Sequence, residues 1–142
     1  MIVLDTNVVS EFMRPQPNMA VVGWLNAQDM HTLHLTAVSL AELRFGIACL
    51  DEGRTKADLS LRLDRMLEEV FPGRILPFVA STAQTFGDRM AGARRNGLAV
   101  GFQDGLIAAI VAASGFSIAT RDTSPFEAMG LQVVNPWGGA AG

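Results

Sequence analysis

The sequence predicts an α/β fold with a five-stranded parallel sheet and helices on both faces. Short apolar runs of strand type alternate with longer segments whose apolar residues recur at helical spacing. Strands that alternate with helices imply right-handed crossovers, which make the strands parallel and cover both faces of the sheet. The length suits one domain over residues 1–142, and the sequence contains no repeat or linker that would divide it.

The first half of the chain is expected to form two strands and four helices. Residues 1–4 and 33–36 are short apolar runs of strand type. A short helix ends near residue 14, and a second begins after Asn18, whose side chain can accept from free first-turn amides, and runs to about residue 27. The segment Ser39-Leu40-Ala41-Glu42 has the spacing of a capping box and predicts the start of a third helix. Residues 55–71 carry one apolar stripe, which indicates an amphipathic helix.

The second half is expected to supply the other three strands. Residues 75–76 begin the third strand, and Ser81-Thr82-Ala83-Gln84 repeats the capping-box spacing before a helix that ends at Asn96-Gly97. A helix from about Asp104 to Gly115 is apolar all round, as in a helix buried on most sides. Residues 116–120 and 131–134 form the fourth and fifth strands, with a loop containing Pro125 between them.

The composition limits the class of protein. The longest apolar run, residues 106–113, is far shorter than the ~20 residues of a membrane span, and Asp5 interrupts the opening apolar stretch that a signal peptide would need. We therefore expect a cytoplasmic protein without a membrane segment. The single cysteine, Cys49, excludes an intrachain disulfide and lies in an apolar segment that suits a buried side chain.

Four separated carboxylates form the candidate site. Asp5 ends the first strand, Glu42 lies in the first turn of the helix after the second strand, Asp104 opens the apolar helix, and Asp122 follows the fourth strand. In open α/β sheets, ligands bind beyond the carboxyl ends of the strands, where the strand order reverses. We therefore expect these four side chains to converge at one edge of the sheet.

Converging carboxylates repel one another unless protons or a shared cation relieve the charge. Because no histidine or cysteine accompanies them, the acids suit a hard ion such as Mg²⁺ or Mn²⁺, and that site suits hydrolysis of phosphodiesters. Whether one or two ions bind is left open. The net charge of −3 argues against a nucleic-acid partner, but neutralising four acids leaves ten acidic against eleven basic residues.

Each acid also has an ordinary structural interpretation. Asp5 could end a strand in an Asx turn, Glu42 could be only the capping-box partner of Ser39, and Asp104 or Asp122 could cap a helix or form a turn. The metal site depends on the four acting together.

Two other phosphate-handling classes fit less well. A haloacid-dehalogenase-like phosphotransferase needs a second Asp two positions after the first, where this chain has Asn7. A dinucleotide-binding module needs G-x-G-x-x-G after the first strand, which is absent.

The acidic positions and their neighbours together resemble the PIN-domain family. The resemblance rests on Leu4-Asp5-Thr6-Asn7-Val8-Val9-Ser10-Glu11, Ala41-Glu42-Leu43, Asp104-Gly105-Leu106-Ile107-Ala108-Ala109 and Ala119-Thr120-Arg121-Asp122. The chain is most similar to VapC/FitB-like toxins of bacterial toxin–antitoxin pairs, and Val134-Asn135-Pro136-Trp137 resembles the FitB-like branch.

That resemblance implies an Mg²⁺- or Mn²⁺-dependent endoribonuclease with a cognate DNA-binding antitoxin. It implies that Asp5, Glu42, Asp104 and Asp122 are the catalytic metal-site residues, and that Thr6, Asn7 and Thr120 are supporting polar residues. The fourth acidic position varies in the family, and here Asp122 is the single acid of its region because Pro125 precedes Phe126.

Several points stay open at this stage. The high apolar content leaves room for a homodimer or an antitoxin groove. Arg121 could contact phosphate or be solvated, and Arg94 and Arg95 could bind RNA or complement a helix dipole. The alternative function is a catalytically weak PIN-fold module that binds RNA or protein, and the RNA target is not indicated.

Overall fold

The computed structural model describes residues 1–138, which contain one five-stranded sheet. Every neighbouring pair of strands is parallel, and the order is β3-β2-β1-β4-β5. The prediction of a five-stranded parallel sheet is confirmed. The chain adds strands on one side of β1 and then on the other, so the strand order reverses between β1 and β4. The strands are β1 (Ile2–Leu4), β2 (Leu33–Thr36), β3 (Ile75–Leu76), β4 (Ser117–Ala119) and β5 (Val133–Val134).

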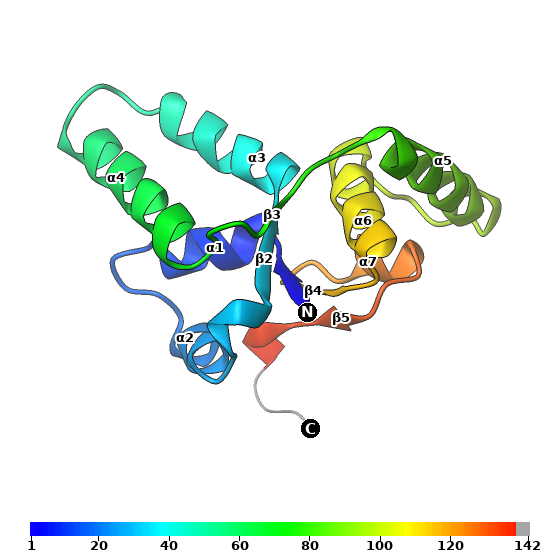
Figure 1. Cartoon of the computed structure of the whole chain (residues 1–142), viewed down its shortest axis with the longest axis horizontal. Coiled ribbons are helices and arrows are strands. Elements are labelled where there is room, and N and C mark those ends of the chain that lie inside the picture. Colours follow the sequence, from blue (N-terminus) through cyan, green and yellow to red (C-terminus); the bar gives the residue numbers. More distant parts are fainter. Residues whose placement is uncertain (139–142) are drawn as a thin grey trace.

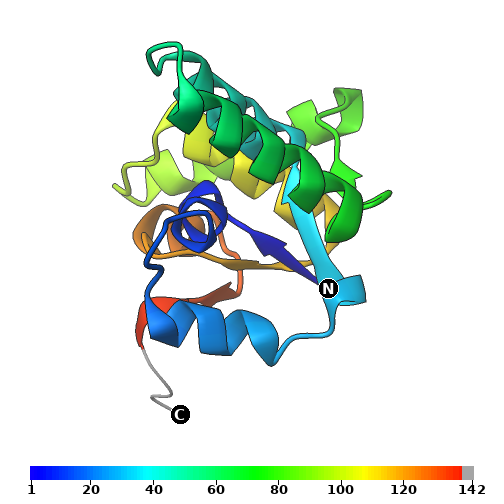
Figure 2. The ribbon, with the colours of Figure 1, turned by 90° about the vertical axis from the view of Figure 1, so that its left-hand side faces the viewer.

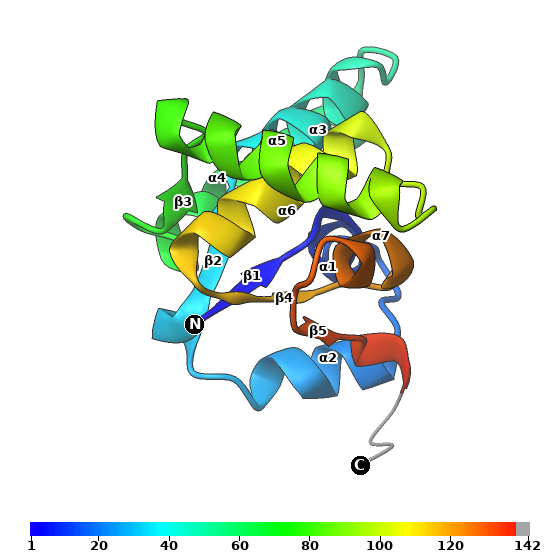
Figure 3. The same cartoon turned by 90° about the vertical axis from the view of Figure 1, so that its right-hand side faces the viewer.

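Helices cover both faces of this sheet, as predicted. In Figure 1, α1, α3 and α4 lie on one side and α5, α6 and α7 on the other. Figure 3 shows α5 as the outer helix, crossing over α6, and α2 runs beneath the sheet with η2 beside it (Figure 2). The helices are α1 (Thr6–Phe12), α2 (Met19–Asn26), α3 (Ala37–Ala48), α4 (Arg54–Glu69), α5 (Ala80–Arg95), α6 (Phe102–Ser114) and α7 (Ser124–Ala128), with 3-10 turns η1 (Met30–Thr32) and η2 (Pro136–Gly138).

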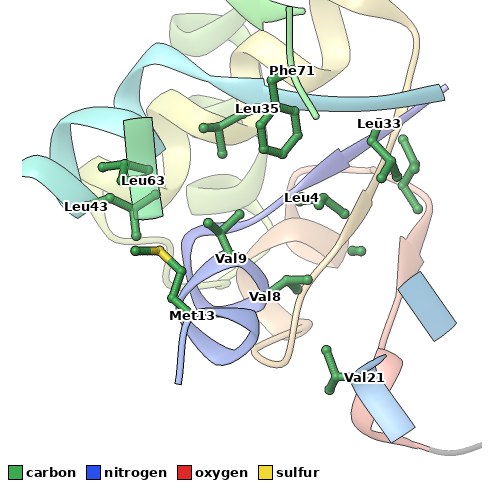
Figure 4. Close-up of a cluster of buried hydrophobic side chains, with 12 residues drawn as sticks. Leu4, Val8, Val9, Met13, Val21, Leu33, Leu35, Leu43, Leu63 and Phe71 are labelled. Atoms are coloured by element: carbon green, nitrogen blue, oxygen red, sulfur yellow. The ribbon is translucent and has the colours of Figure 1, made fainter. Parts of the chain in front are cut away.

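The sheet is buried on both faces, which explains why its strands are continuously apolar. Successive side chains of β1 point to opposite faces, so Leu4 joins the core cluster shown in Figure 4 while Val3 packs with Ile107 and Val111 of α6. Residues 107–111 of α6 are all buried, as expected for a helix that is apolar all round. This central position of α6 fixes the place of its first turn, which carries Asp104.

Both predicted capping boxes are wrong. Helix α3 begins directly after β2, and its N-cap is Thr36, whose Oγ1 accepts from Ser39 N at 3.0 Å. Helix α5 begins at Ala80, and Thr82 Oγ1 accepts from Val79 N at 3.4 Å. In both cases the helix starts before the Ser that was expected to cap it, because the preceding strand or loop leads into the helix without a linker.

Three smaller expectations also change. Helix α6 begins at Phe102, two residues before Asp104, and the predicted loop around Pro125 contains α7, where proline occupies the first turn that it suits. Cys49 is exposed at the end of α3 and is not buried. Within residues 1–138, no helix has the length and hydropathy that crossing a bilayer requires.

Candidate active site

An open cavity of about 480 Å³ lies at the carboxyl ends of β1 and β4, where the strand order reverses. Asp5, Glu42, Asp104 and Asp122 all line it. Four elements deliver them: the end of β1, helix α3, the first turn of α6 and the loop after β4. The structure therefore brings together the four acids that the sequence singled out, although their role as metal ligands stays a prediction.

Asp5 is the most constrained of the four. It is 5% exposed and caps α1, with its Oδ1 accepting from Thr6 N and its Oδ2 accepting from Thr120 Oγ1, both at 2.8 Å. Burial raises the pKa of Asp5 from 3.8 to about 6, the two hydrogen bonds oppose that rise, and the charges of Asp104 and Glu42 add to it. Binding of a proton or a cation would therefore lower the free energy of this buried carboxylate.

Thr120, at the end of β4, connects the two sides of the cavity. Its buried hydroxyl donates to Asp5 and accepts from Asn7 Nδ2 and from Asp122 N, each at 3.2 Å. The Asn7 side chain continues the network, because its Oδ1 accepts from Arg121 N at 3.3 Å. One hydroxyl thus ties the end of β1 to the loop after β4.

Of the three polar residues expected to support the site, Thr120 and Asn7 make hydrogen bonds at the cavity through their side chains. Thr6 contributes its backbone N–H to Asp5. The Thr6 hydroxyl is buried and has no hydrogen-bond partner in the described part of the chain.

The other three acids are more accessible to solvent. Glu42 and Asp104 are half-buried, whereas Asp122 is exposed. Glu42 lies in the second turn of α3, so it is not the capping-box partner of Ser39 and that interpretation is excluded. The pKa of Asp104 is raised, first by burial and then by the charges of Asp122 and Glu42. The four carboxylates therefore affect one another electrostatically.

The residues of the cavity fit a hard divalent cation by their chemistry. Neither histidine nor cysteine lines it, and carboxylate oxygens are the donors that Mg²⁺ and Mn²⁺ prefer. Within residues 1–138, however, no group of three or more His, Cys, Asp or Glu side chains is arranged to hold one ion directly. Mg²⁺ commonly binds one or two carboxylates and keeps several waters, which is compatible with this spacing.

Four residues of the cavity wall had no predicted role: Ser10, Glu11, Arg14 and Trp137. Glu11 is 5% exposed, pairs with Arg14 at 3.1 Å and accepts from Trp137 Nε1 at 3.4 Å. The position of Glu11 did carry a signal, because it lies one helical turn after Asn7 and so on the same face of α1. Trp137 lies 126 residues from Glu11, and no local pattern could place it there.

Comparison with known proteins gives consistent matches over nearly the whole chain. The family model described as "PIN domain" matches residues 2–130. The chain is 47% identical over 137 residues to "VapC ribonuclease Y4jK" of Sinorhizobium fredii, covering 96% of this chain and 98% of that protein. It is 42% identical to "Toxin FitB" of Neisseria gonorrhoeae, covering 96% and 99%. The solved structure of FitAB bound to an IR36 DNA fragment superposes with a TM-score of 0.92 at 41% identity, covering 96% of each chain.

Proposed function

The chain belongs to the PIN-domain family, and on that premise we propose that it is an endoribonuclease that uses Mg²⁺ or Mn²⁺. The observation that carries this proposal is the convergence of four carboxylates on one cavity where the strand order reverses. The naming of one relative as a ribonuclease supports the choice of RNA as the substrate. We also propose that residues 1–142 form a single PIN domain.

Asp5, Glu42, Asp104 and Asp122 would hold the metal, directly or through water. A bound divalent cation supplies an activated water at neutral pH and stabilises charge on the leaving oxygen of a phosphodiester. The protein's own contribution is to fix the ligands. Thr120 holds one oxygen of Asp5 while the Thr6 N–H holds the other, so this carboxylate keeps one orientation.

Electrostatics explains why these acids would take up a cation. Burial and neighbouring charges raise the pKa of both Asp5 and Asp104, so their ionised forms are costly without a positive charge nearby. A metal ion would offset much of the negative charge of the cavity and allow a phosphate group to approach it.

We further propose that the protein is the toxin of a toxin–antitoxin pair. It would act as a homodimer and bind a cognate DNA-binding antitoxin, as suggested by the similarity to Toxin FitB and to the DNA-bound FitAB complex. An RNA substrate and a DNA-binding partner imply that it acts in the cytoplasm. Co-expression with the product of a short neighbouring reading frame should yield a stable complex that no longer cuts RNA, and a fully active complex would contradict this assignment.

The nuclease activity is tested with the purified, antitoxin-free protein and total cellular RNA. We expect cleavage with Mg²⁺ or Mn²⁺ and none in chelator, and we expect Asp5→Asn to abolish it while the fold stays intact. Asp88→Asn is the matched control, because Asp88 is an exposed aspartate on α5 outside the cavity. Cleavage in chelator, or equal activity of the two variants, would contradict the metal mechanism.

If the metal-loaded protein binds RNA without cutting it, the alternative of a catalytically weak binding module replaces the nuclease.

A further inference from the structure

A second group of side chains lines the same cavity beside the four acids: Glu11, Arg14, Arg121 and Trp137. The Arg121 guanidinium lies over the Trp137 ring, with its central carbon 5.4 Å from the ring centroid. We infer that Arg121, held on Trp137, binds an RNA phosphate adjacent to the one that is cut. This inference rests on the proposed ribonuclease function and adds a substrate-binding residue to it.

The charge of the cavity favours such a residue. Its wall contains five carboxylates and two arginines, a formal excess of three negative charges, and that excess repels an RNA backbone. A divalent ion at the acidic cluster would offset much of this charge at the phosphate that is cut, and a cation beside the cluster would attract the adjacent phosphate.

Of the two arginines that line the cavity, only Arg121 lacks an ion-pair partner among the described residues and can offer its guanidinium to a phosphate. Arg14 is paired with the buried carboxylate of Glu11 at 3.1 Å. Arg121 is exposed, and its guanidinium makes no ion pair within residues 1–138. A guanidinium that lies over an aromatic ring is attracted to the ring face, and its N–H groups remain available to the oxygens of a phosphate.

Arg121 is also held in position from two sides. Its backbone N–H donates to Asn7 Oδ1 at 3.3 Å, next to the acids, and its side chain rests on Trp137. Trp137 is fixed in turn, because its Nε1 donates to Glu11 at 3.4 Å and its backbone N–H donates to Asn135 Oδ1 at 2.9 Å. A long side chain that is ordered before binding loses less entropy when it meets its ligand.

The plainer interpretation is that the Arg121–Trp137 pair only stabilises the turn η2. An exposed cation–π pair contributes little to the free energy of unfolding, so that role alone predicts a small loss of stability. It predicts no change in RNA affinity. Binding, and not stability, therefore separates the two interpretations.

The test uses the full chain carrying Asp5→Asn, in Mg²⁺, so that RNA binds without being cut. Anisotropy of a fluorescein-labelled single-stranded RNA of mixed sequence is measured over a series of salt concentrations. Arg121→Ala should weaken binding about tenfold and make the slope of log K against log salt shallower by about 0.7, the loss of one phosphate contact. Trp137→Ala should weaken binding in the same direction, and Arg121→Lys should retain the salt slope.

Arg54→Ala is the control, because Arg54 is an exposed arginine at the start of α4 and does not line the cavity. Equal binding by the Arg121→Ala and Arg54→Ala proteins, or no RNA binding in the Asp5→Asn background, would overturn the inference. Failure of the parent protein to cut RNA that it still binds would overturn the proposed function alone, because the role of Arg121 in binding is measured separately.

Discussion

Replacing Asp5 with Asn should stabilise the metal-free protein at neutral pH while removing its activity. Burial of the Asp5 carboxylate raises its pKa from 3.8 to about 6, so the ionised form is less favourable in the folded state than in the unfolded state. Asn carries no charge to bury, yet its oxygen can still accept from Thr6 N. Its amide can donate to Thr120 Oγ1, whose hydroxyl can turn to Asp122 O, 3.5 Å away.

The size of the effect follows from the pKa. At 1.36 kcal/mol for each tenfold change in proton affinity, the difference between 3.8 and about 6 amounts to about 3 kcal/mol, which is an upper bound on the gain. The folded state binds this proton more tightly, so the parent loses stability as the pH rises from about 4 to about 6. Below about pH 4, Asp5 is protonated in both states and the advantage of Asn should disappear.

The assay is urea unfolding of the parent and of the Asp5→Asn protein in chelator, at about pH 4 and about pH 7. We expect similar free energies of unfolding at the lower pH and a gain of about 1–3 kcal/mol for the variant at the higher pH. Mg²⁺ should then stabilise the parent more than the variant, since ligand binding stabilises the folded state. If the variant is less stable than the parent at neutral pH, burial of the ionised Asp5 carboxylate does not destabilise the folded protein as expected.

Three further predictions concern Thr120, Asp104 and Gly105. Thr120→Val leaves Asp122 N and Asn7 Nδ2 without their acceptor and should lower the rate of RNA cleavage about 10–100-fold. Thr120→Ser keeps the hydroxyl and should retain most of the rate, and equal losses in the two variants would argue against the role of the hydroxyl. Asp104→Asn should lower cleavage more than Asp122→Asn, because Asp104 is half-buried beside the other acids and Asp122 is exposed; the reverse order in the same assay would contradict this ranking. Gly105→Ala should have a lower free energy of unfolding in urea than Gly87→Ala, because both changes gain helix propensity but only the Cβ at residue 105 would lie 2.6 Å from Met90 Sδ and 3.0 Å from Phe86 Cε2, so that these side chains must shift. A Cβ at residue 87 meets nothing within 4 Å, and equal free energies of unfolding for the two variants would show that packing at Gly105 does not matter.

The sheet and its helices were largely predictable because they follow from periodicity. The apolar run before Asp5 and the apolar helix after Asp104 both reflect burial on two faces of a parallel sheet. The exact helix starts were not predictable, because Thr36 and Ser39 are both acceptable N-cap residues and only the direct passage from β2 into α3 decides between them.

The site was predictable in part for the same reason. Residues that follow parallel strands meet at one edge of the sheet, so the positions of Asp5 and Asp122 followed from the order of strands and helices. The Glu11–Trp137 contact was not predictable, because it joins the first helix to the last turn of the described chain and depends on how η2 packs. The residues around Pro125, which were expected to form a loop after Asp122, begin helix α7.

The proposed metal site is tested most directly by the chemistry of the ends that form when the purified protein cuts RNA in Mg²⁺. If the four carboxylates hold a metal that activates water, the attacking group is not the ribose 2′-hydroxyl, and the products should carry hydroxyl and phosphate ends without a cyclic phosphate. We expect such ends in Mg²⁺ and no cleavage in chelator. Products that end in a 2′,3′-cyclic phosphate, formed equally well in chelator, would contradict the account.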